Sequence, residues 1–324
     1  MEDAVVGGYF KGIKVGENHL PISHLFYADD AIFMGEWEKE NVIKINPILK
    51  LFHIASGLQI NLHKSKLYGV GVQQELVEDV AGCTGCGADY IPFIYLGLLV
   101  GNKMNKISAW DPMVEKMKNR LTKWKAKMLS IGGRLTLIKS VLGSLGNYDL
   151  SLFRAPVTVI KSMEKLRSRF FWGMEEDEKK LHWVRWDLIL NEKKKGGLEV
   201  GSLLAINQAR VYKWRWRFVN GAQSLWVKVI KSCHGEDGGF LHQLSNVVAG
   251  RTGVWRGVVK VVDILHSEGS LSRDVVGVKL IMEVILIFGR IYGVARFRAI
   301  VDFLGCFIWR SSRRLWLVML ELIC

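Results

Sequence analysis

Apolar residues recur with two different periods along this chain. Up to about residue 105 they come in short runs separated by turn residues. Residues 24–27 and 31–34 are two such runs on either side of Asp29-Asp30, which is the pattern of a β-hairpin. Residues 39–55 carry apolar side chains at helical spacing, and Gly57 is placed to end that helix. Further strand-like runs are residues 9–15, 58–72 and 91–101.

From Trp110 onward the spacing becomes helical and many polar positions become basic. An apolar stripe is formed by Met113, Met117, Leu121, Trp124 and Met128. A basic stripe on a neighbouring face is formed by Lys116, Arg120, Lys123 and Lys127. Further helices are expected after Gly132-Gly133, from Pro156 and from Ser202.

These patterns predict an α+β fold with small antiparallel hairpins at residues 1–105, a helical region at 106–234 and a tail at 235–324. The tail has an unusual composition, because 25 lysines lie up to Lys231 and two follow it. Residues 278–324 contain no Asn, Gln, His, Thr or Pro, although folded domains use such residues in turns. We therefore hypothesise that the tail is degenerate or translated out of its original reading frame. A genuine hydrophobic accessory segment is the alternative.

The charge balance favours a polyanionic partner. The chain has 45 Lys and Arg against 31 Asp and Glu, a formal net charge of +14. Nucleic acid is the first candidate and an acidic membrane surface the second, while an ordinary basic surface remains the alternative. Five scattered cysteines do not suggest a disulfide framework, and Cys83 and Cys86 have zinc-like spacing without a second pair. The absence of a secretory signal or an unbroken apolar span predicts a protein of the nucleus or cytoplasm.

Two adjacent carboxylates at the tip of a hairpin need an explanation, because they repel each other. Asp29 and Asp30 would be neutralised by a divalent cation, and oxygen ligands of this kind suit Mg²⁺. Nucleotidyl transfer by two metal ions uses such ligands. A solvated Asp-Asp turn is the alternative interpretation of this dipeptide alone.

Four motifs in order resemble the reverse transcriptases of non-LTR retrotransposons, in particular the LINE-type elements of plants. Residues 24–34, with Tyr27-Ala28-Asp29-Asp30, look like the catalytic YADD hairpin. Residues 56–65 resemble the next motif of the polymerase palm, and residues 93–98 resemble the primer-grip strand. Residues 129–139 are similar to the thumb. The resemblance covers roughly residues 1–240, and the order of the motifs makes it specific.

The resemblance implies an RNA-directed DNA polymerase, a nucleotidyltransferase that uses Mg²⁺, an RNA template and a DNA primer. It implies that Asp29 and Asp30 coordinate the catalytic metal. Contacts with the primer are implied for Tyr27, Ala28, Tyr95, Leu96 and Gly97. Lys64 would contact pyrophosphate, with a solvated lysine as the alternative. The basic stripe Lys116, Arg120, Lys123 and Lys127 would bind duplex phosphates, unless it is an ordinary solvated helix face.

Two departures from the family pattern predict that these 324 residues alone have no polymerase activity. The family holds its metal with a further aspartate on an upstream palm strand, and residues 1–28 contain no matching motif. The fingers, which bind the incoming nucleotide, also have no counterpart in the sequence. A non-catalytic, basic nucleic-acid-binding module is the rival function, and a pseudogene product without a role is a third possibility.

Overall fold

The computed structural model describes residues 1–27, 30–124, 126–142, 146–174, 178, 182–221, 223–240, 253–267 and 315–323. Two compact units are present, and each is described by itself. The first contains residues 1–102 together with 221–240 and 315–323. The second contains residues 103–220 together with 254–267.

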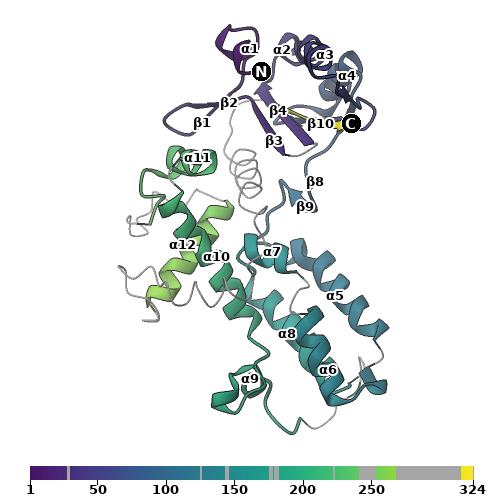
Figure 1. Ribbon diagram of the computed structural model, residues 1–324, viewed down its shortest axis with the longest axis vertical. Coiled ribbons are helices and arrows are strands. Elements are labelled where there is room, and N and C mark those ends of the chain that lie inside the picture. The colour runs from purple at the N-terminus through teal and green to yellow at the C-terminus, as the bar shows by residue number, and fades with distance from the viewer. Residues whose placement is uncertain are drawn as a thin grey trace. The chain divides into compact units, whose positions relative to one another are not determined.

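The first unit is built around a mixed sheet whose strands run in the order β3-β4-β10-β6-β7. These strands are β3 (His24–Tyr27), β4 (Asp30–Glu36), β10 (Leu315–Ile323), β6 (Lys66–Val70) and β7 (Gly87–Asp89). The short strand β5 (Gln59–Ile60) pairs with the end of β10. All pairs are antiparallel except β6–β7. In Figure 1 the yellow strand β10 lies beside β4.

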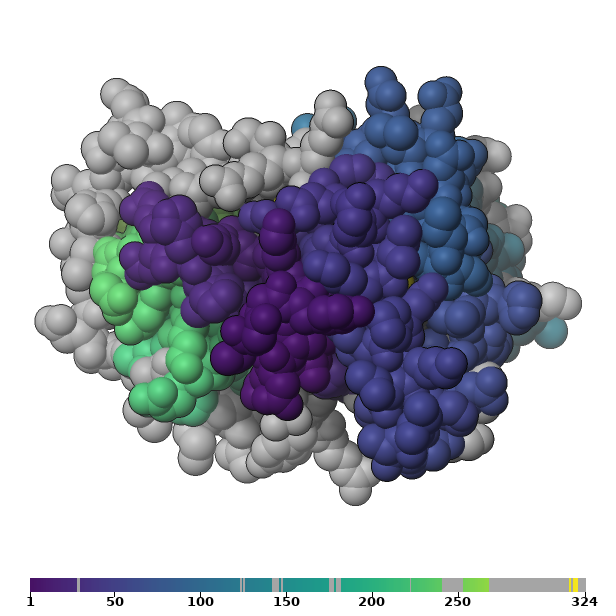
Figure 2. All heavy atoms as spheres, turned by 90° about the horizontal axis from the view of Figure 1, so that it is seen from above, coloured from purple at the N-terminus to yellow at the C-terminus, as the bar shows by residue number. Residues whose placement is uncertain are grey.

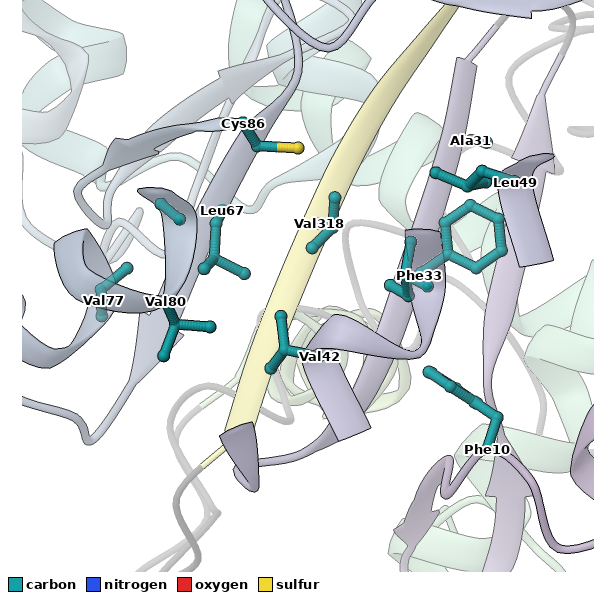
Figure 3. Packing of buried hydrophobic residues seen from close by; sticks show 12 residues of the cluster. Phe10, Ala31, Phe33, Val42, Leu49, Leu67, Val77, Val80, Cys86 and Val318 are labelled. Atoms are coloured by element: carbon teal, nitrogen blue, oxygen red, sulfur yellow. The ribbon is translucent and has the colours of Figure 1, made fainter. Parts of the chain in front are cut away.

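One face of this sheet carries the core cluster of the first unit. Phe33 on β4, Val318 on β10 and Leu67 on β6 are all less than 5% exposed. Val42 and Val77, from two helices, pack into the same cluster (Figure 3). Ile32 and Met34 point to the opposite face of β4 and are also fully buried. The centre of the sheet is therefore buried on both faces, which explains why β4 is apolar at consecutive positions.

Among the residues that the structure describes, five helices and four more strands also belong to the first unit. They are α1 (Glu2–Val6), α2 (Lys39–Ile43), α3 (Ile45–Ser56), α4 (Gln74–Thr84), α11 (Leu225–His234), β1 (Ile13–Val15), β2 (Leu20–Ile22), β8 (Phe93–Tyr95) and β9 (Leu98–Val100). Strands β1 and β2 form one hairpin, and β8 and β9 form another. Pro47 lies in the first turn of α3, where its missing N–H costs no helical hydrogen bond.

Helix α11 is joined to the first hairpin across a long stretch of sequence. The Ser232 hydroxyl donates to the Val15 carbonyl at 2.8 Å, and the Glu17 N–H donates to the Ser232 carbonyl at 2.9 Å. Gly16 has a φ of 68°, and a Cβ there would collide with Ser232. This close approach requires glycine. Figure 2 shows the purple N-terminal surface adjoining a green surface in the colour range of α11.

The second unit is helical. It contains η1 (Ile107–Trp110), α5 (Asp111–Lys123), η2 (Ala126–Met128), α6 (Ile131–Leu137), the π-helical η3 (Ile138–Leu142), α7 (Asn147–Leu152), α8 (Val157–Phe171), α9 (Trp186–Leu190), η4 (Lys193–Lys195), α10 (Leu203–Asn220) and α12 (Val254–Ser267). The Ser130 hydroxyl accepts the Gly133 N–H at 3.1 Å and thereby caps α6. Helices α10 and α12 pack together, with the Phe218 and Trp255 rings 5.3 Å apart (Figure 1).

Two polar side chains, the partly exposed Glu164 and the buried Asn207, join helices of the second unit. Glu164 on α8 accepts hydrogen bonds from the Leu203 N–H at 2.7 Å and the Trp186 indole N–H at 2.9 Å. It also pairs with Arg167, whose side chain is only 1% exposed. Asn207 on α10 bonds the Ala155 N–H and the carbonyls of Leu150 and Phe153. Both side chains therefore give hydrogen-bond partners to groups from other parts of the unit.

The expected α+β class is confirmed. Most predicted elements are present, including the hairpin at residues 24–36 and helices from Pro156 and beyond Ser202. The single helix expected to carry residues 113–128 was wrong, because α5 ends at Lys123. Met128 lies in η2 and is 82% exposed rather than part of a buried stripe. The division into regions at 105 and 234 stays a prediction.

Candidate functional site

The predicted metal ligands belong to the β3–β4 hairpin of the first unit. Tyr27 and Asp30 are register partners, and Ala28 and Asp29 between them lie outside the described residues. Asp30, the first residue of β4, is half-buried, as is Tyr27. The hairpin forms here because Ala31 and Phe33 bury one face of β4 and Ile32 and Met34 the other. The strand is therefore held in the sheet by apolar side chains on both of its faces.

His24 anchors the other end of the hairpin. It is the register partner of Phe33, and its Nδ1 lies 2.8 Å from the Ser23 hydroxyl. Its ring centroid is 4.8 Å from that of Phe26. Burial lowers the pKa of His24 below its usual value of 6.5, so the neutral ring is favoured.

The described residues do not by themselves complete a magnesium site. No group of three His, Cys, Asp or Glu side chains able to hold a metal ion occurs within the described ranges, and Asp29 lies outside them. The strand β10, which pairs with β4 on the side away from β3, places the backbone of Glu321 opposite Asp30. Carboxylate ligands suit Mg²⁺ chemically, but two-metal chemistry needs several of them around the ions. We therefore derive no catalytic step through a metal ion.

The predicted primer-contacting residues Tyr95, Leu96 and Gly97 form the tight turn of the β8–β9 hairpin. Tyr95 pairs with Leu98, so Leu96 and Gly97 make a two-residue connection. Their φ values are 47° and 81°, both left-handed, as in a type I′ turn. Glycine adopts this conformation freely, whereas a bulky leucine does so only under strain. The structure thus brings these three residues together and shows backbone strain at Leu96.

Two aromatic side chains of β8, the strand that leads into this turn, are packed against other residues of the first unit. Tyr95 is 2% exposed, and Phe93 stacks on Tyr68 of β6 with ring centroids 4.1 Å apart. Burial, with the Asp89 carboxylate nearby, raises the pKa of Tyr68 to about 12. The buried pair of Phe93 and Tyr68 therefore links β8 to strand β6 of the main sheet.

Lys64 lies in the turn between β5 and β6. Its side chain is exposed, and its backbone N–H donates to the Asn61 side-chain oxygen at 3.2 Å. The Asn61 carbonyl also accepts the Ser65 hydroxyl hydrogen bond at 2.7 Å. This local network explains the turn without any role for the Lys64 ammonium group. The predicted pyrophosphate contact stays a prediction.

The predicted basic stripe is divided between two elements of the second unit. Lys116 and Arg120 are exposed on α5, and Lys123 is the last residue of that helix. Lys127 lies instead in η2, where its ammonium group is 2.8 Å from the Glu178 carboxylate. Lys116 and Arg120 are thus exposed on one helix, whereas Lys127 has an anionic partner.

A groove between α5 and α8 carries basic residues that the sequence pattern did not single out. Its volume is about 800 Å³, and Leu121, Leu166 and Phe170 contribute apolar walls. Lys118 and Arg169 line it as well, beside Lys127. Lys118 was visible as one of the lysines of α5. Arg169 lies 51 residues further along the chain, on α8, and only the packing of α8 on α5 brings the two together.

Sequence comparisons connect the chain with two curated proteins of Arabidopsis thaliana. It is 33% identical over 129 residues to "Putative ribonuclease H protein At1g65750", a match covering 40% of this chain and 21% of that protein. It is 23% identical over 137 residues to "Uncharacterized mitochondrial protein AtMg00310", covering 39% of this chain and 89% of that protein. The chain thus spans about one fifth of the first relative. No family model matches the chain.

Within the described part of the chain, no helix has both the length and the apolarity that crossing a bilayer requires.

Proposed function

We propose that this chain derives from a retrotransposon and is the palm-hairpin and thumb portion of a LINE-type RNA-directed DNA polymerase. In this proposal Asp29 and Asp30 are metal ligands of the complete polymerase, with Mg²⁺ as the metal. Tyr27, Ala28 and the turn Tyr95-Leu96-Gly97 lie along the primer. RNA template and DNA primer are the ancestral partners.

The observation that carries the proposal is the hairpin closed by Tyr27 and Asp30. The register leaves only Ala28 and Asp29 to connect the two strands, so the motif occupies the short connection expected of a metal-binding YADD hairpin. The strained turn at Leu96 adds support, because strain in a well-packed region is often found at functional sites. The similarity to a much longer Arabidopsis protein is consistent with a portion of a larger polyprotein.

We further propose that the 324 residues alone do not polymerise DNA. Two carboxylates without a third ligand, and without a nucleotide pocket, lack the preorganised electrostatics that nucleotidyl transfer needs. The test is primer extension with Mg²⁺ and deoxynucleotides on an RNA template, compared with an Asp29→Ala/Asp30→Ala variant. Equal background in both is expected. Extension by the unsubstituted chain and not by the variant would refute the inactivity.

The second candidate function is a non-catalytic module that binds nucleic acid, and the exposed pair Lys116 and Arg120 on α5 favours it. Affinity for a labelled RNA–DNA duplex should then fall steeply with salt, because each neutralised phosphate releases counterions. A Lys116→Glu/Arg120→Glu variant should bind more weakly, and the slope of log affinity against log salt should be smaller by roughly two.

A charge-matched control is available in the same unit. Lys193 and Lys194 are exposed in η4, so a Lys193→Glu/Lys194→Glu variant changes the net charge by the same amount. It should bind like the unsubstituted chain if α5 makes the contact. Equal weakening by both variants would show that only net charge matters, and an affinity independent of salt would rule out phosphate binding.

A further inference from the structure

The central strand of the main sheet is contributed by a segment remote in sequence from both of its neighbours. Strand β10 is antiparallel to β4 over seven register pairs, from Leu315–Glu36 to Glu321–Asp30. On its other side it pairs with β6, from Leu315–Val70 to Met319–Lys66. In the strand order β10 stands between β4 and β6. The β3–β4 hairpin and the parallel pair β6–β7 are thus joined through β10.

The space between β4 and β6, called the seat below, accommodates one extended strand. It offers a backbone hydrogen-bonding edge on each side, and both edges call for an antiparallel strand. Val318 fills the core face between Phe33 and Leu67 (Figure 3). Leu317, between Met34 and Tyr68, fills the opposite face and is 2% exposed. Without an occupant, two apolar strand edges would be open to another chain.

The occupant has the composition of a strand that pairs readily with other chains. Residues 315–323 read LWLVMLELI, with one charged residue and neither proline nor glycine. Segments of high β-propensity and low charge, without proline, are those that add to exposed strand edges. Nothing in the segment resembles the lysines or prolines that protect natural edge strands.

No short loop connects β10 to either of its neighbours in the sheet. β10 does not follow β4 or β6 through a hairpin, and the described helix before it, α12, belongs to the other unit. We propose that the seat between β4 and β6 is a strand-acceptor site that also takes β10 of a second copy of this chain, giving a strand-exchanged dimer. This inference does not depend on the proposed function, because it rests only on strand pairing.

The closed and exchanged forms contain the same strand pairs, so they differ mainly in how the strand is supplied. Effective concentrations are on the order of millimolar for short connections and fall as a connection lengthens. Val70 at the end of β6 and Leu315 at the start of β10 are 245 residues apart. Exchange is therefore expected to become appreciable as the protein concentration approaches that range. A dimer that forms at high concentration should contain each β10 beside the β4 of the other copy.

Cysteine pairs placed in register can report this arrangement in the full chain. Glu36 and Leu315 are direct partners, and the Cα separations of antiparallel partners fall within the range of a disulfide. One copy carries Glu36→Cys and the other Leu315→Cys, both in a background with Cys83, Cys306 and Cys324 changed to serine. The copies are mixed at about 1 mM, diluted and oxidised. The matched control replaces Glu36→Cys by Glu38→Cys, which lies outside the strand.

A disulfide-linked dimer from the Glu36→Cys and Leu315→Cys copies, at least several-fold above the Glu38→Cys control, is the expected result. Light scattering of the unsubstituted chain should show dimer increasing with concentration, and this measurement does not depend on the folding of any variant. The proposal is overturned if the unsubstituted chain stays monomeric up to about 1 mM. It is also overturned if a dimer forms but the disulfide appears only inside one chain that carries both Glu36→Cys and Leu315→Cys, and never between the two singly substituted copies.

Discussion

Replacing Glu164 by leucine should destabilise the second unit more than any exposed substitution there. The carboxylate is the acceptor for two N–H groups, from Leu203 and from the Trp186 indole. It is also the counter-ion of Arg167, which is buried and additionally donates to the carbonyls of Val200 and Gly201. Burial lowers the pKa of Arg167, and Glu164 opposes that effect by stabilising the charged guanidinium.

The size of the effect follows from what Glu164→Leu leaves behind. Leaving a buried arginine without its counter-ion costs about 3–5 kcal/mol. Each unsatisfied N–H adds about 1–3 kcal/mol, although water entering beside the partly exposed Glu164 position would reduce this. A loss of at least 4 kcal/mol is thus expected, a large part of the roughly 5–15 kcal/mol that stabilises an ordinary domain.

A double substitution separates the charge from the hydrogen bonds. Arg167→Met alone should cost less than Glu164→Leu, because the remaining carboxylate keeps its bonds to Leu203 and Trp186. Glu164→Leu/Arg167→Met should cost less than the sum of the two, since no unpaired charge remains. It should still be destabilising, because the two N–H donors stay without an acceptor.

The measurement is urea unfolding followed by hydrogen exchange in peptides from α8 and residues 200–203, which report on the second unit alone. Glu115→Leu on the exposed side of α5 is the control and should change stability by less than about 0.5 kcal/mol. The reasoning is refuted if Glu164→Leu lies within about 1 kcal/mol of the unsubstituted chain. It is equally refuted if the double variant is less stable than the sum of the singles predicts.

Three further predictions concern other parts of the structure. Asn207→Leu should cost about 3 kcal/mol or more, because it leaves three buried backbone groups unpaired, and an unchanged urea midpoint would contradict this. Leu96→Asn should stabilise the first unit by about 1 kcal/mol by placing Asn-Gly in a type I′ turn, whereas Leu96→Val should destabilise it by about 1–2 kcal/mol; the reverse order in thermal unfolding would refute the assigned turn. Because burial lowers the pKa of His24, the unfolded chain binds its proton more readily, so the associated stability is present above pH 6.5 and is lost as the pH falls. Unfolding free energies from pH 7.5 to 5 should therefore decline more steeply for the unsubstituted chain than for His24→Gln, and parallel curves would exclude this contribution.

The sequence by itself determined the local elements, because short-range signals specify them. Two apolar runs on either side of Asp29-Asp30 predicted the hairpin, and Gly57 marked the end of α3 with a left-handed φ of 73°. The four-residue spacing of Met117 and Leu121 correctly predicted the buried face of α5. Such patterns depend on neighbours a few residues apart, which a single sequence displays directly.

The sequence pattern was misleading where the apolar spacing continued beyond the end of a helix. The stripe through Met128 kept its spacing although α5 had ended at Lys123. Lys127 consequently lies outside α5 and pairs with Glu178, a partner 51 residues away that no spacing rule could indicate. The predicted basic stripe was therefore longer than the helix that carries it.

Only the tertiary structure decided which remote segments meet. The apolar strand at residues 315–323 could not be assigned to the seat between β4 and β6 from its own pattern, because a run that is apolar on both faces indicates burial but not a partner. Glu164 likewise accepts hydrogen bonds from Trp186 and Leu203, which lie 22 and 39 residues further along the chain. Strand neighbours and buried hydrogen bonds depend on the folded arrangement of the whole unit, and sequence distance carries no information about them.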